Sequence, residues 1–209
     1  MLVLIVPCSS AMHRDLKMTS LFLTSALGLA MTLGCACKHP QAPAGAVPAT
    51  TATLAPPRVP AAIAVPAGAQ LVAHLHATGA QVYGCGPGPA GGAAFAWTLK
   101  KPDATLTDDS GAVVGTHVAG PTWTSTDGSA VVGKKLAQAD APDATAVPWL
   151  LLRAVSSSGT GVFSGVTYVQ RVATTKGEPP ATGCEAATVG AEARADYTAD
   201  YYFYRGGAT

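Results

Sequence analysis

The chain has 209 residues, of which 48% are hydrophobic and only 12% are charged, and its formal net charge is +1 at pH 7. This length fits one folded domain with tails, and so few charges exclude a chain that is disordered throughout. No run of Lys and Arg is longer than a pair, which excludes nucleic-acid binding through a basic patch. The composition therefore implies no charged partner.

The N-terminal residues have the pattern of an export signal. An apolar run at residues 18–33 follows a short basic stretch and precedes small residues, which is the order of a secretory signal peptide. The run is too short for a stable membrane span. We therefore expect residues 1–34 to be a signal peptide. Residues 1–11 form a second apolar block that a signal does not need, so we expect translation to start at Met12 or Met18.

A lipid anchor is expected where this signal ends. Residues 32–35 read Thr-Leu-Gly-Cys, which resembles a bacterial lipobox, although Thr32 stands where that motif usually carries Leu. The lipobox cysteine is acylated and becomes the first residue of the mature protein. We expect lipidation of Cys35, with simple cleavage near Ala36 as the alternative. The protein would then be exported, either as a periplasmic or outer-membrane lipoprotein or as a secreted protein, and would meet a membrane only through its anchor.

The rest of the chain divides into a linker and a domain. Residues 35–65 are rich in Ala, Pro and Thr and almost free of charge, so they cannot build a core and predict a disordered tether. Residues 66–209 hold all three Trp and all six Tyr, as expected for the folded domain. This domain contains only two cysteines, Cys85 and Cys184. We expect them to form a disulfide, because exported domains with two cysteines most often pair them.

Alternating side chains predict strands throughout the domain. From Leu71 to Tyr83 the even positions, with His74 and His76, share one face. Residues 149–152 do not alternate and are expected to be buried on both faces, and only residues 187–196 admit a helical alternative. Further strands are predicted at residues 95–99, 113–118, 130–136, 147–155, 161–172 and 197–204. Short antiparallel strands at this spacing predict an all-β domain, either a single sandwich or a small barrel.

Several longer motifs occur in a fixed order along the domain. They are residues 115–123 (GTHVAGPTW), 147–152 (VPWLLL), 168–171 (YVQR) and 197–204 (YTADYYFY). With these motifs, residues 66–205 resemble the domain of unknown function 3455 family, which is found in exported bacterial and fungal proteins. The resemblance implies a secreted domain with a cysteine couple and no established activity.

Three histidines form the first candidate site. His74 and His76 are two residues apart on a predicted strand, which places both imidazoles on one face about 7 Å apart. His117 is the only other histidine of the domain, and three imidazoles could hold a metal ion. The plainer interpretation is a half-exposed strand with a polar face. A metal-dependent enzyme with Glu192 or Asp127 as acid or base is the alternative function; the catalytic residues themselves are unknown, and we predict no cofactor.

Aromatic side chains form the second candidate site. Trp123, Tyr202 and Tyr204 could line a ligand-binding face, although a β domain also fills its core with such residues. Both faces of the last predicted strand are aromatic, so one row of tyrosines is expected to be exposed. We therefore expect an exported, lipid-anchored domain of the cell envelope with a binding or structural role, acting on an unknown ligand or envelope component.

Overall fold

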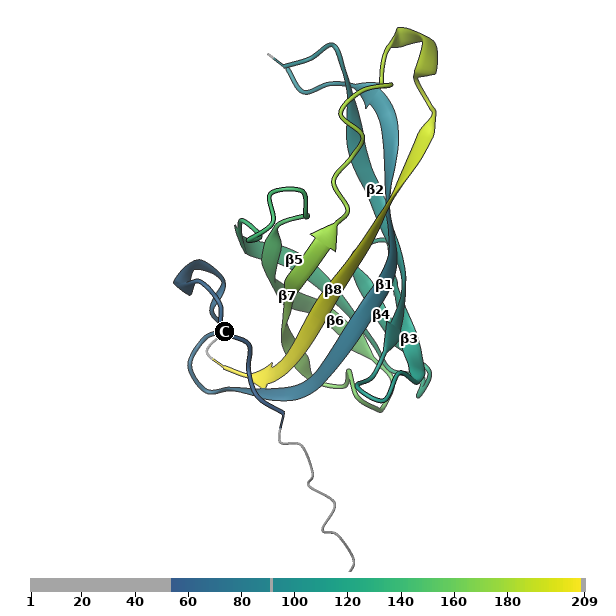
Figure 1. The fold of residues 1–209 in the computed structure, drawn as a ribbon. Coiled ribbons are helices and arrows are strands. Elements are labelled where there is room, and N and C mark those ends of the chain that lie inside the picture. The colour runs from purple at the N-terminus through teal and green to yellow at the C-terminus, as the bar shows by residue number, and fades with distance from the viewer. Residues whose placement is uncertain (1–53, 91, 208–209) are drawn as a thin grey trace, which may run out of the picture. The chain divides into compact units, whose positions relative to one another are not determined.

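The computed structural model describes residues 54–90 and 92–207. In this part of the chain, eight antiparallel strands form one sheet that closes into a barrel in sequence order, with β1 paired to both β2 and β8 (Figure 1). The strands are β1 (Ala69–Pro87), β2 (Phe95–Thr107), β3 (Val113–Val118), β4 (Thr122–Ser125), β5 (Ala130–Ala139), β6 (Trp149–Ser158), β7 (Val166–Lys176) and β8 (Glu192–Gly206). The all-β prediction is confirmed, and of the two predicted architectures the protein adopts the barrel.

The predicted export features lie outside this part of the chain. The signal peptide at residues 1–34, the lipidation site at Cys35 and most of the 35–65 linker precede the described residues. Between residues 54 and 207, no helix is both long and apolar enough to cross a membrane.

An aromatic core fills the barrel because side chains alternate between its two faces. On β8, Tyr201 and Phe203 are buried inside, whereas Asp200 and Tyr202 lie on the outer face. Trp123 of β4 is fully buried, and its ring centroid lies 5.4 Å from that of Tyr201 and 5.9 Å from that of Phe203. The inner row of β8 thus supplies much of the core.

One end of the barrel is closed by the connection between β6 and β7. Phe163 of this connection is fully buried and lies 4.6 Å from Phe203 between ring centroids. Two backbone N–H groups hold the connection against the β4–β5 turn: Phe163 donates to Ser129 Oγ at 3.1 Å, and Val162 donates to Asp127 Oδ2 at 2.8 Å. In an up-and-down barrel, the β3–β4 and β5–β6 turns lie at the opposite end, which this connection does not cover.

A short segment ahead of β1 covers part of the outer face. Its single 3-10 turn, η1 (Ala61–Ile63), buries Ile63 completely in a cluster with Leu151, Tyr168 and Tyr204. The Gln170 side-chain amide donates to the Ile63 carbonyl at 2.7 Å. This part of the predicted 35–65 linker therefore packs on the barrel, because Ile63, together with Val59 and Val65, contacts an apolar patch there.

Two local expectations have opposite outcomes. The expected burial of residues 149–152 is confirmed for Leu151, which packs under η1, and for Leu152, which lies in the barrel core, whereas Trp149 and Leu150 are only partly buried. The helical alternative for residues 187–196 is wrong. Only a 3-10 turn, η2 (Ala186–Thr188), occurs there before β8 begins, because an antiparallel pairing with β1 takes up the following residues.

The predicted disulfide is confirmed. Cys85 near the end of β1 is bonded to Cys184 in the segment that precedes β8, and their Cα atoms lie 5.3 Å apart. Backbone hydrogen bonds support the bridge, since the Cys85 N–H donates to the Ala191 carbonyl and the Gly190 N–H donates to the Cys85 carbonyl. The disulfide ties two segments that are 99 residues apart in the sequence.

Candidate functional site

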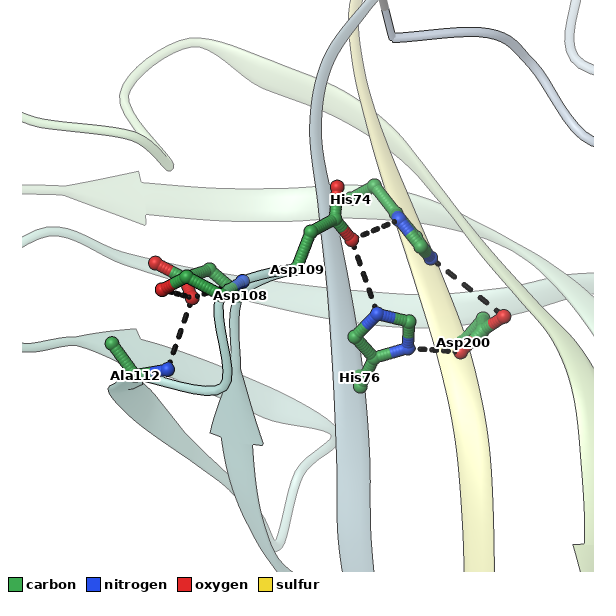
Figure 2. Close-up of polar contacts among 7 residues, drawn as sticks. His74, His76, Asp108, Asp109, Ala112 and Asp200 are labelled. Carbon is green, nitrogen blue, oxygen red and sulfur yellow. Dashed lines mark hydrogen bonds and ion pairs between the residues drawn. The ribbon is translucent and has the colours of Figure 1, made fainter. Parts of the chain in front are cut away.

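Two of the predicted histidines form a polar cluster with two aspartates on the outer face of the barrel (Figure 2). Asp109 Oδ1 lies 3.0 Å from His74 Nδ1 and 3.1 Å from His76 Nε2. On the other side, Asp200 Oδ1 accepts from His76 Nδ1 at 2.7 Å, and Asp200 Oδ2 lies 3.6 Å from His74 Nε2. Each imidazole therefore lies between the same two carboxylates.

The pairing of β1 with β8 positions three members of this cluster. His76 is directly opposite Asp200 in the register, and His74 is opposite Tyr202. The Tyr202 ring stacks on the His74 ring, with centroids 4.3 Å apart and planes 19° apart. The strand ladder and this stack together fix the His74 ring, which is only 14% exposed.

Asp109 comes from the turn between β2 and β3, and the residue before it holds that turn. Asp108 Oδ1 accepts the backbone N–H groups of Ser110 at 2.9 Å and Ala112 at 3.0 Å, and also the Ser110 hydroxyl at 2.6 Å. Such an Asx turn restricts the local backbone. Asp109 is then left with its carboxylate over the two imidazoles although its side chain is 65% exposed.

The carboxylates also set the electrostatics of the cluster. The hydrogen bond to Asp200 raises the pKa of His76 above its usual value of 6.5, while partial burial opposes the change. One ligand atom from each of His74, His76 and Asp109 lies within 4.8 Å of the others. These three side chains could therefore hold a metal ion between them.

His117, the third predicted histidine, is not brought to this cluster. It points into the barrel, where its ring stacks on Trp123 with centroids 4.4 Å apart and planes 5° apart. Its Nδ1 donates to the Thr122 carbonyl at 3.0 Å, and burial lowers its pKa to about 3, so the ring is neutral. A three-histidine metal site is not formed. His117 points into the barrel, whereas His74 and His76 point outward from the barrel wall, because successive side chains of a strand alternate between its two faces.

The two carboxylates proposed as acid or base with that site have structural partners elsewhere. Glu192 forms an ion pair with Lys100 at 2.7 Å. Asp127 accepts hydrogen bonds from the backbone N–H of Ser129 and the backbone N–H of Val162. Both carboxylates therefore stabilise the surface of the barrel.

A second candidate site, which the sequence did not indicate, is a cavity of about 350 Å³ that enters the barrel. Its inner wall is formed by aromatic and aliphatic side chains, including His117, Trp123, Tyr201 and Leu152. The β3–β4 turn, with Gly120 and Pro121, also borders it, so the cavity lies toward the end of the barrel that the β6–β7 connection does not close.

Positive charge surrounds this cavity. Arg171 of β7 lines it and is only 8% exposed. Its Nε and Nη2 donate to the Pro148 carbonyl at 3.2 and 2.7 Å, and no carboxylate between residues 54 and 207 forms an ion pair with it. Four exposed lysines also border the cavity, namely Lys101, Lys134 and Lys135, and Lys100, whose charge is paired with Glu192.

Some polar groups of the cavity wall have no hydrogen-bond partner. Gln81 Nε2 and Trp123 Nε1 are buried donors without an acceptor in the described structure. A buried donor without a partner costs about 1–3 kcal/mol. Burial also raises the pKa of the Tyr201 phenol, while the nearby positive charge of Arg171 opposes this change. The residues that line the cavity thus include a buried cation but no carboxylate.

The predicted aromatic set is divided among three environments. Trp123 belongs to the cavity wall, and Tyr202 lies half-buried against His74 on the outer face. Tyr204 is only 1% exposed, because η1 covers it, and its hydroxyl donates to Gln170 Oε1 at 2.7 Å. The expected exposed row of tyrosines is therefore reduced to Tyr202.

Two residues that matter for these sites were not singled out from the sequence. Asp109 lies in a sequence typical of a turn. Nothing in the neighbouring residues indicates that its carboxylate would reach the histidines of β1. Arg171 lies in a mostly apolar stretch of β7. A charged residue in a buried strand is rare, so this position could have been recognised from the sequence as a candidate site residue.

Of the comparisons with known proteins, only that with protein families gives a match. No curated protein and no solved structure matches the chain significantly. A family model does match residues 66–205, which cover all of β1–β7 and all but the last residue of β8. The chain therefore belongs to the family described as "Protein of unknown function (DUF3455)".

Proposed function

We propose that this protein is an exported, lipid-anchored binding protein of the cell envelope, whose barrel binds a small anionic molecule. The observation that carries the proposal is the buried guanidinium of Arg171, which lines the cavity without a carboxylate partner. A buried charge is costly unless it is paired. An anionic group of a ligand would supply the missing partner.

The remaining features of the cavity specify the ligand class. A volume of about 350 Å³ suits a small molecule, and barrel mouths are common ligand sites. Trp123 and Tyr201 offer flat apolar surfaces, so the body of the ligand should be apolar or aromatic. The lysines around the cavity would attract the anion and raise its rate of association.

Export and anchoring rest on different observations. The apolar run at residues 18–33 and the lipobox-like residues 32–35 support cleavage of a signal peptide and acylation of Cys35. The Cys85–Cys184 disulfide supports an oxidising compartment, because such bonds persist mainly outside the cytosol.

The ligand proposal is tested by titrating the protein with 2-naphthoate and with the neutral 2-naphthamide, following tryptophan fluorescence and heat. We expect saturable binding of the carboxylate at one site and at least about tenfold weaker binding of the amide, because a desolvated charge-assisted pair is worth about 1.5–3 kcal/mol. Arg171→Met should abolish the preference. Arg153→Met, at an exposed arginine of β6, should leave it unchanged. Equal binding of both probes, or a preference that survives in Arg171→Met, would contradict the proposal.

The anchor is tested by expressing the full chain in bacteria that are fed radiolabelled palmitate. We expect label in the wild-type protein and none in Cys35→Ala. Cys37→Ala is the matched control, because it removes a cysteine two residues away and should keep the label. Labelling that is lost in neither variant would exclude acylation at Cys35.

A further inference from the structure

The cluster on the outer face of the barrel has the spacing of a metal site. Asp109 Oδ1 lies 3.0 Å from His74 Nδ1 and 3.1 Å from His76 Nε2 (Figure 2). Four ligands at about 2.0–2.1 Å from Zn²⁺ are separated by about 3.3 Å along the edges of their tetrahedron. The two distances to Asp109 Oδ1 are therefore within a few tenths of an ångström of a tetrahedral edge, and all three donor atoms lie within 4.8 Å of one another.

When both rings are neutral, their hydrogen-bond partners also favour a cation at this position. A neutral imidazole has one N–H and one lone pair. All four ring nitrogens of His74 and His76 face carboxylate oxygens of Asp109 or Asp200, so in neutral rings two lone pairs face groups that can only accept. A cation beside Asp109 would take both of these lone pairs and leave each ring with its N–H toward Asp200.

Asp200 is suited to orient the two ligands from behind. It accepts from His76 Nδ1 at 2.7 Å and lies 3.6 Å from His74 Nε2, which is buried and has no hydrogen bond. A carboxylate that holds the outer ring nitrogen of a metal-bound histidine fixes the tautomer and orientation of the ring. The Asx turn at Asp108 likewise holds the backbone from which Asp109 extends.

We propose that His74, His76 and Asp109 bind one divalent cation of the zinc type, with Asp200 orienting both imidazoles. Two imidazoles and one carboxylate suit Zn²⁺, Co²⁺, Ni²⁺ or Cu²⁺ better than Mg²⁺ or Ca²⁺. Three protein ligands leave a fourth position for water or for a donor from another molecule. The site does not depend on the proposed function, because it shares no side chain with the barrel cavity.

The test is a titration of the metal-stripped full chain with ZnCl₂ and with CoCl₂. We expect one equivalent of Zn²⁺ by calorimetry and native mass spectrometry, and the intense visible absorption of four-coordinate Co²⁺. MgCl₂ should give no saturable signal. Absence of stoichiometric Zn²⁺ binding to the folded protein would overturn the proposal.

Variants locate the site. His74→Gln and His76→Gln should each abolish stoichiometric binding, and Asp109→Asn should remove the carboxylate ligand. Asp200→Asn should weaken binding about 10–100-fold without removing it, as for other groups that orient metal-bound histidines. Asp143→Asn is the matched control, because this aspartate lies in another exposed turn, where it caps Thr145.

Three variants separate this site from the alternatives. His117→Phe should retain one equivalent of Zn²⁺, since His117 lies inside the barrel; loss of binding in that variant while it stays folded, as judged by circular dichroism, would contradict the assignment. Unchanged Zn²⁺ affinity in a His74→Gln/His76→Gln double variant would overturn it. Arg171→Met should leave Zn²⁺ binding intact, so failure of the barrel-ligand proposal and failure of the metal proposal are distinguishable.

Discussion

The inner and outer faces of the barrel wall carry opposite chemistry. On the outer face, two imidazoles lie between two carboxylates, all within hydrogen-bond or ion-pair reach. On the inner face, the Arg171 guanidinium and the neutral His117 ring border a cavity without any carboxylate. Tyr201 and Asp200, which are adjacent in β8, belong to different faces and serve different sites.

The contrast shows how solvent decides what a histidine does. His76 is 42% exposed, and its hydrogen bond to Asp200 raises its pKa. His117 is 3% exposed, and burial lowers its pKa to about 3. The same residue type is therefore a polar group paired with carboxylates outside the barrel and a flat, neutral packing group within it.

The largest expected effect comes from removing the central ring of the inner face. Trp123→Ala should destabilise the protein by about 3–5 kcal/mol in urea unfolding, because a fully buried tryptophan leaves a cavity that its neighbours cannot fill. Trp97→Ala is the control, because this ring is only partly buried, and it should cost less than half as much. Similar losses in the two variants would show that the barrel interior is not the main core.

A smaller effect on the free energy of unfolding is expected from a change of pH. Acid lowers the stability contributed by His117 on the inner face and raises that contributed by His76 on the outer face. The pKa of His117 is about 3 in the folded barrel and about 6.5 in an unfolded chain, so the unfolded state binds the proton first as pH falls. His117 therefore lowers stability progressively below about pH 6.5, by about 2 kcal/mol between pH 7 and pH 5.

This dependence is measured by urea unfolding at both pH values. His117→Phe keeps a ring against Trp123 but cannot titrate, so the loss between pH 7 and pH 5 should shrink by about 2 kcal/mol relative to the wild-type protein. If both proteins lose equal stability, His117 does not carry the effect.

The smallest effect is expected on the outer face. The folded pKa of His76 is raised, so its interaction with Asp200 contributes stability below the unfolded pKa, and this contribution is lost as pH rises through the folded value. Because the pair is partly exposed, His76→Gln should cost less than about 1 kcal/mol at acidic pH and less still at alkaline pH. Urea unfolding of both proteins in metal-free buffer measures this difference between acidic and alkaline pH. A larger loss of stability at alkaline pH would contradict a raised pKa of His76 in the folded protein.

Two similar turns show where local sequence stops being informative. Residues 109–115 and 127–133 are near copies of each other. In the second copy Asp127 itself caps the turn through Ser129, whereas in the first copy Asp108 does so and Asp109 is released toward the histidines. The difference depends on the residue before each copy and on the strand that lies opposite.

The sequence by itself determined the alternation that places His74 and His76 on one face, the all-β character of the domain and the cysteine pair. Each of these follows from strand periodicity or from composition. The tertiary structure alone decided that β8 closes onto β1, which brings Asp200 to His76 across 124 residues and leaves Arg171 in the wall of a cavity. Closure depends on the pairing and stagger of all eight strands together, and no single segment contains that information.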